Sequence, residues 1–91
     1  MSAARPMRMR NVNGAATTTP ERVSVARGLG QYLRISNLDA TNNLEISFDG
    51  GRNFYTISPT DPPLDVNAIY HFFFVKSSTG TVNWAALLGE G

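Results

Sequence analysis

The sequence predicts an all-β protein, a small antiparallel β-sandwich of jelly-roll-like type or a barrel, with an extended N-terminal arm. Apolar and polar residues alternate with a period of two in several short segments, which is the pattern of strands that bury one face. Gly, Pro, Asn or Asp interrupts nearly every longer stretch, and no segment has the apolar spacing of an amphipathic helix. We therefore expect one β-sandwich domain at residues 22–91, preceded by the arm at residues 1–21.

The arm shows no lasting periodicity and contains two prolines and a glycine, which favours an extended segment. Near its start Met and Val residues alternate with arginines, a pattern that suits addition as a strand to another sheet. We predict that the arm docks on a partner and that Arg5, Arg8 and Arg10 supply the contact.

The first half of the domain contains three alternating segments, at residues 22–27, 32–36 and 44–48. A Gly-Leu-Gly break separates the first two, and the polar loop 37–43 separates the second from the third. The apolar residues expected to point inward are Val23, Val25, Leu33, Ile35, Leu44, Ile46 and Phe48.

The second half begins with the Asp-Gly-Gly turn 49–51, a strong hairpin signal because glycine reaches positive φ without strain. The returning strand is expected at residues 53–57. Three prolines then make residues 58–63 an irregular crossing. Strands follow at residues 69–76 and 81–88.

The segment 69–76 is apolar on both faces, as expected for a strand that is central in a sandwich or lies at a subunit contact. A small domain without disulfides gains stability by association, because its own core is limited. We therefore predict a homo-oligomer, a trimer or a pentamer. Its candidate interface residues are Tyr70, Phe72, Phe74 and Trp84.

Charge is distributed unevenly along the 91 residues, of which 42% are hydrophobic and only 16% charged. Six arginines against one glutamate give +5 up to Arg34, and two cations against six acids give −4 after it. Charge alone allows the two halves to attract each other between neighbouring copies, or the arm to bind an acidic surface elsewhere.

Catalytic chemistry has few candidates, because the chain has no Cys and one His. His71 lies within the aromatic strand, where we expect a hydrogen-bonded structural role. Paired carboxylates for acid–base chemistry would have to come from Asp61 with Asp65 or from Glu45 with Asp49. The second pair flanks an alternating strand and a turn, so solvated or turn-forming roles explain it. We predict no enzyme.

Cofactor motifs are incomplete. Asp49 and the loop residues Asp39, Asn42 and Asn43 offer oxygen atoms, but the chain lacks a calcium-binding loop. The Gly-Leu-Gly break lacks the third glycine and the helix of a dinucleotide site. We predict no metal and no cofactor. We do not expect nucleic-acid binding, because acidic residues flank the aromatic strands.

Membrane association is not expected either. The longest apolar run, residues 69–75, is far shorter than the roughly 20 residues that span a bilayer, and the basic start lacks the apolar stretch of a secretory signal.

Residues 33–91 contain the series LEISFDGGRNFYTI, then a Pro-rich stretch with LDV, then IYHFFFVKSSTGTVNWAALLGEG. In this succession of segments the chain resembles small virion proteins of tailed bacteriophages. The resemblance implies a non-enzymatic β-sandwich that decorates or cements a capsid as a symmetric oligomer. The implied partner is the major capsid protein, and the implied location is the capsid surface of a virion made in the host cytoplasm.

The alternative is a carbohydrate- or receptor-binding β module of a phage neck or tail. Such a module would display Tyr32, Tyr55 and Trp84 in a groove, because sugars stack on exposed aromatic rings. Exposure of these three side chains therefore distinguishes the two functions.

Overall fold

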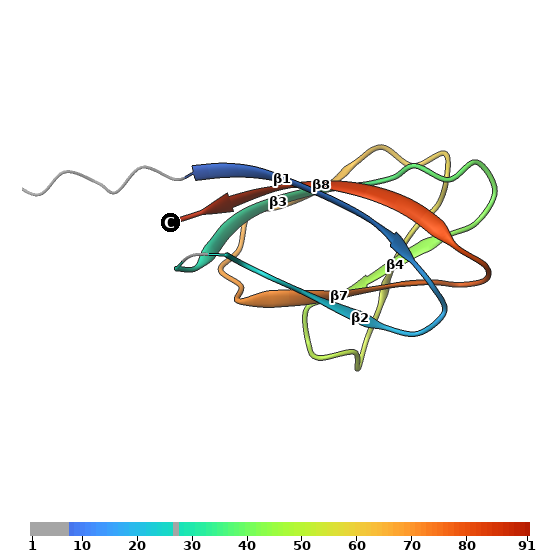
Figure 1. The fold of residues 1–91 in the computed structure, drawn as a ribbon, viewed down its shortest axis with the longest axis horizontal. Coiled ribbons are helices and arrows are strands. Elements are labelled where there is room, and N and C mark those ends of the chain that lie inside the picture. Colours follow the sequence, from blue (N-terminus) through green and yellow to red (C-terminus); the bar gives the residue numbers. More distant parts are fainter. Residues whose placement is uncertain (1–7, 27) are drawn as a thin grey trace, which may run out of the picture.

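A computed structural model describes residues 8–26 and 28–91, which form eight strands and no helix (Figure 1). None of these residues therefore belongs to a helix that could cross a membrane. The strands are β1 (Arg8–Ala16), β2 (Glu21–Ser24), β3 (Gly30–Asn37), β4 (Leu44–Ser47), β5 (Tyr55–Ile57), β6 (Leu64–Val66), β7 (Phe72–Ser77) and β8 (Val82–Glu90).

The strands form two antiparallel sheets with the orders β1-β8-β3-β6 and β2-β7-β4-β5. The first strand pairs with the eighth, the second with the seventh, the third with the sixth and the fourth with the fifth. This is the arrangement of a long hairpin rolled into two layers, which is a jelly roll. The predicted all-β sandwich is therefore confirmed, and the two separate sheets exclude the barrel.

The core lies between the two layers, which Figure 1 shows one above the other. Alternate residues of each strand point into it, as the period of two requires. Strand β8 contributes Trp84 and Leu88, and β7 contributes Phe73 and Val75, all with 2% exposure or less. The central strands of both sheets therefore supply much of the buried apolar area.

Residues 8–16 depart from the predicted arm, because they form β1 within the chain's own sheet. All nine residues pair with β8, from Arg8 opposite Glu90 to Ala16 opposite Val82. These residues do add to a sheet as a strand, as their alternating pattern suggested, but they pair with β8 of the same chain rather than with another protein. Inward-facing Val12 and Ala16 contribute to the core. Residues 1–7, which include Arg5, lie outside the described part.

Two further boundaries differ from the prediction. Strand β6 directly follows the prolines and is held by Leu64 and Val66, which pack against the core. Strand β7 begins at Phe72 rather than at residue 69, because Tyr70 makes a separate bridge to Gly30 of the other sheet.

The predicted Asp-Gly hairpin between β4 and β5 is confirmed. Gly50 and Gly51 have φ values of 76° and 90°, which side chains rarely adopt. The turn is longer than expected, because its residues gather around the Asp49 carboxylate and β5 begins only at Tyr55.

Candidate functional site

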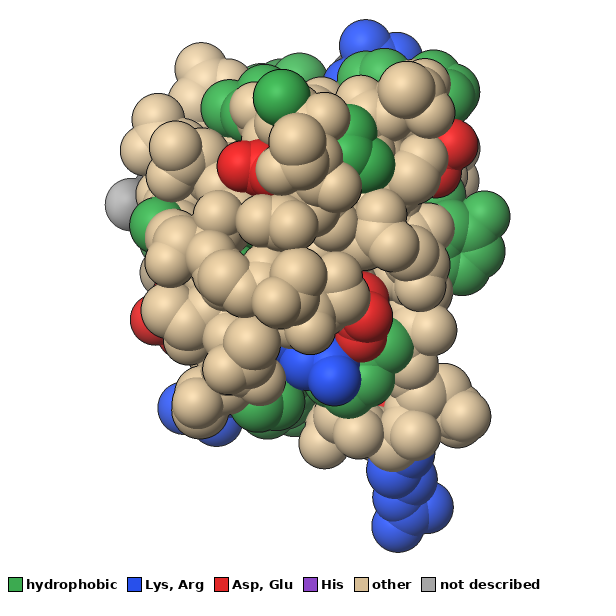
Figure 2. Space-filling model, turned by 90° about the vertical axis from the view of Figure 1, so that its right-hand side faces the viewer, with side chains coloured by type: hydrophobic (Ala, Val, Ile, Leu, Met, Phe, Trp, Pro, Cys, Tyr) green, Lys and Arg blue, Asp and Glu red, His purple; other side chains and the backbone are tan. Residues whose placement is uncertain are grey.

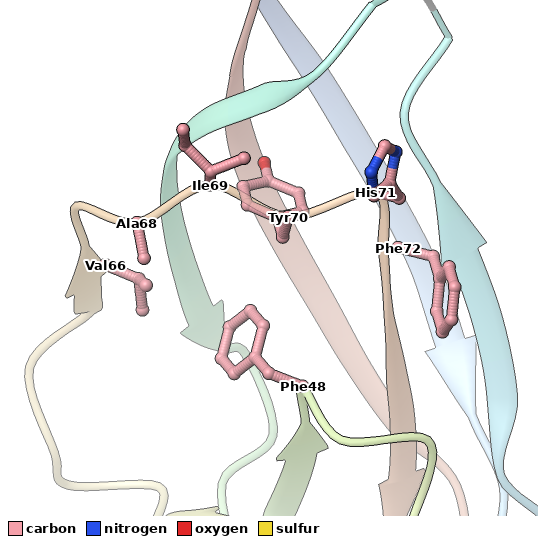
Figure 3. A pocket seen from close by; sticks show the side chains of 7 residues that line it. All are labelled: Phe48, Val66, Ala68, Ile69, Tyr70, His71 and Phe72. Carbon is pink, nitrogen blue, oxygen red and sulfur yellow. The ribbon is translucent and has the colours of Figure 1, made fainter.

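An apolar groove of about 440 Å³ opens at the end of the sandwich where β7 begins (Figure 3). Three segments meet there: the residue after β4, the end of β6 and the link from β6 to β7. The groove is lined by Phe48, Val66, Ala68, Ile69, Tyr70, His71 and Phe72.

Aromatic packing fixes the inner side of the groove. The ring of Tyr70 lies 6.2 Å from that of Phe48 and 6.0 Å from that of Phe73, both edge-on. The Tyr70 hydroxyl donates a 2.9 Å hydrogen bond to the carbonyl of Tyr32. Burial, reinforced by the nearby Glu90 charge, raises the pKa of Tyr70 to about 12. The hydroxyl therefore stays neutral and acts as a structural donor.

The rim of the groove exposes three large apolar side chains. Ile69 is 71% exposed, Phe48 41% and Phe72 36%. Single exposed apolar residues are ordinary, but a group around one hollow is typical of a contact surface. At the opposite end, seen in Figure 2, hydrophobic side chains form separate patches between polar atoms. The groove is therefore the leading candidate for a functional surface.

His71 is exposed at this rim, which corrects the predicted structural role. The chain turns between the Tyr70 bridge and the start of β7, so His71 and Phe72 both face outward. The backbone carbonyl of His71, rather than its ring, holds the local structure by accepting a 3.0 Å hydrogen bond from the Val25 amide.

The predicted oligomer interface is divided by the structure. Tyr70 and Trp84 are 7% and 2% exposed, so their assignment to an intermolecular contact is wrong. Both side chains point between the sheets, where the core of the monomer already covers them. Phe72 and Phe74 lie on the outer face of β7 with ring centroids 5.8 Å apart, and their role in a contact stays a prediction.

The three predicted docking arginines also have different positions. Arg5 lies outside the described residues, and Arg8 is exposed. Arg10 forms a two-bond ion pair with Glu90, a partner that the sequence analysis missed. The hydrogen bond to Glu90 raises the pKa of Arg10, and the pair holds Arg10 against its own protein.

Carboxylates in the turns are occupied by their own loops. Asp49 accepts hydrogen bonds from the amides of Arg52 and Asn53, and these and further donors lower its pKa. Asp39 accepts from the amides of Thr41 and Asn42, with the same effect on its pKa. Within residues 8–26 and 28–91, no three His, Asp or Glu side chains gather in a geometry that would hold a metal ion.

The three aromatics of the alternative function do not form one surface. Trp84 is buried, so the prediction that it is displayed is wrong. The Tyr32 hydroxyl donates a 2.6 Å hydrogen bond to Asp65. Tyr55 is 61% exposed and lines two smaller hollows beside β5. A three-ring sugar platform is thus excluded.

The chain has no significant match to a protein-family model, a curated protein or a solved structure.

Proposed function

We propose that this chain is a non-enzymatic virion structural protein. In this proposal it decorates a phage capsid at the outer surface and stabilises it as a homo-oligomer. The observation that carries the proposal is the apolar groove with its exposed rim of Phe48, Ile69 and Phe72. Such a surface gains free energy when a partner covers it, because apolar area leaves water.

The chemistry of the groove favours a protein partner over a small polar ligand. Its lining is mostly apolar, and its polar side-chain atoms come from Tyr70 and His71. The Tyr70 hydroxyl already donates a hydrogen bond to the backbone carbonyl of Tyr32. A sugar site needs several convergent hydrogen-bonding groups, which this groove does not offer. Jelly rolls serve in both capsid proteins and lectins, so the site rather than the fold favours the structural role.

The docking element of the proposal therefore differs from the arginine-bearing arm. Apolar side chains of the major capsid protein would enter the groove between Phe48 and Ile69. Arg8, which is exposed, adds a cationic contact from the start of β1. Arg10 contributes little, because Glu90 neutralises its charge.

The test is co-sedimentation of the purified protein with capsid shells of the phage that encodes it. The variant Ile69→Ser removes a rim contact without opening the core, because this side chain is 71% exposed. The variant Phe48→Ser removes a second rim contact together with ring packing against Tyr70 and Phe73, so it should also lower the free energy of unfolding. We expect each to weaken shell binding by at least about tenfold.

The matched control is Leu38→Ser, which removes a 59% exposed apolar side chain from the β3–β4 link at the opposite end. It should bind shells like the unmodified protein. Thermal unfolding verifies that all three variants fold. Full shell binding by both rim variants, or no binding by the unmodified protein, would contradict the proposal.

A further inference from the structure

The outer edge of β1 is the longest unpaired sheet edge in the described structure. Strand β1 has nine residues and pairs with β8 alone (Figure 1). The other three edge strands, β2, β5 and β6, have four, three and three residues. An edge of nine residues is about 30 Å long and presents a row of backbone donors and acceptors.

Over residues 11–16 this edge lacks the features by which proteins prevent pairing between molecules. Soluble proteins protect edges with charges, prolines or bulges. Residues 11–16 contain no charge and no proline, and the ladder from β1 to β8 has no register shift. Asn11, Asn13 and Ala15 are exposed on the outer face of the strand. From residue 11 to residue 16 the edge is thus regular and uncharged, and the two cations of the strand, Arg8 and Arg10, lie at its start.

We propose that β1 pairs with β1 of a second copy of this chain, antiparallel and across a two-fold axis. Full overlap of the nine residues places Val12 opposite Val12 and Asn11 opposite Asn13 of the second copy. Odd-numbered residues then face odd-numbered residues, and even-numbered residues face even-numbered ones. The backbone N–H groups that point away from β8 therefore meet carbonyl groups that also point away from β8. Each side-chain face of one sheet continues into the same face of the other. The two four-stranded sheets become one continuous sheet.

The distribution of charge along β1 favours this register and a second copy as the occupant. Full overlap places Arg8 opposite Ala16 and Arg10 opposite Gly14, so the cations of one copy meet neutral residues of the other. A shift that pairs only the first residues of both strands would place Arg8 opposite Arg10, with like charges side by side. The strand is therefore complementary to itself in one orientation.

Two double variants at the exposed asparagines test the pairing. Asn11→Lys with Asn13→Lys places two like-charge pairs across the contact. Asn11→Lys with Asn13→Glu changes the same sites but places two opposite-charge pairs there. Sedimentation equilibrium of the unmodified protein should give a dimer. We expect the first variant to dissociate at least about tenfold more readily than the second.

A cross-link tests the register, because the chain has no Cys of its own. A mixture of the Asn11→Cys and Asn13→Cys proteins should form a disulfide-linked dimer on oxidation, since the proposed register places these positions opposite each other. Each protein alone should cross-link far less, because its substituted position faces an asparagine.

A monomer, a trimer or a pentamer in solution would overturn the inference, as would equal dissociation of the two charge variants. So would equal cross-linking of the mixture and of the single proteins. None of these results depends on shells, and shell binding through the groove is measured with other variants. Failure of the dimer and failure of the proposed function are therefore distinguishable.

Discussion

Arg10 and Glu90 face each other through two hydrogen bonds of 2.9 and 2.8 Å, which join β1 to β8. The Glu90 side chain is only 5% exposed, whereas that of Arg10 is 37% exposed. A Glu90 oxygen also accepts a 2.8 Å hydrogen bond from the Ala26 amide, between β2 and β3. One carboxylate thus connects three segments that are far apart in sequence.

Arg10→Met should lower the free energy of unfolding by about 2–3 kcal/mol, because it leaves the Glu90 carboxylate buried without its cation. Partial exposure of Arg10 keeps the loss below that of a fully buried pair. Urea unfolding measures it. Arg8→Met is the control, because Arg8 is exposed on the same strand and should matter little. Equal losses of unfolding free energy in the two variants would show that the Arg10–Glu90 pair does not stabilise the fold.

Gly30→Ala should destabilise the protein by about 3 kcal/mol, because overpacking at a buried site forces its neighbours to move. A Cβ at Gly30 would lie 2.3 Å from Cζ of Tyr70, whose ring is fixed by its own hydrogen bond and packing. At Gly14 the corresponding closest atom, in the Trp84 ring, is 3.0 Å away. Gly14→Ala should therefore cost less, and the reverse order in urea unfolding would contradict this account.

Acid should destabilise the fold through Asp39, Asp49 and Asp65, whose pKa values are lowered from 3.8 by hydrogen bonds. The main donors are the amides of Asn42 and Asn53 to the first two and the Arg34 side chain to Asp65. Because the folded state holds these protons less tightly, their stabilisation is complete above pH 3.8. It is lost as the pH falls through the lower folded-state values.

Unfolding experiments between about pH 6 and pH 2 measure this loss. Asp49→Asn should be less stable at neutral pH and should show a shallower decline in acid, because it removes one of the three titrating groups. An unchanged decline in this variant would mean that Asp49 does not contribute.

Much of the sandwich follows from local pattern. Alternation over Leu44, Ile46 and the residues around Leu33 specifies which face is buried, and the Asp-Gly-Gly turn specifies the hairpin between β4 and β5. These features depend on residues close in sequence. Local pattern therefore predicts the class of fold and most of the strands.

Strand β1 could not be assigned from local pattern, because its stability comes from pairing with β8, more than 60 residues away. From the sequence alone Arg10 is expected to face solvent, whereas in the folded protein it forms an ion pair with Glu90. The groove could not be predicted either, because it also depends on residues that are far apart in sequence. Phe48 continues the alternation of β4 in sequence, yet the strand ends at Ser47 and leaves this ring 41% exposed beside Ile69.

Strand β8 lies between β1 and β3, although it is the last of the eight to leave the ribosome. Until residues 82–90 have emerged, β1 has no neighbour in its sheet and β3 has β6 alone. Cotranslational folding therefore cannot assemble this layer strand by strand. This layer closes only once residues 82–90 are available, and pairing between segments so far apart in sequence is slow.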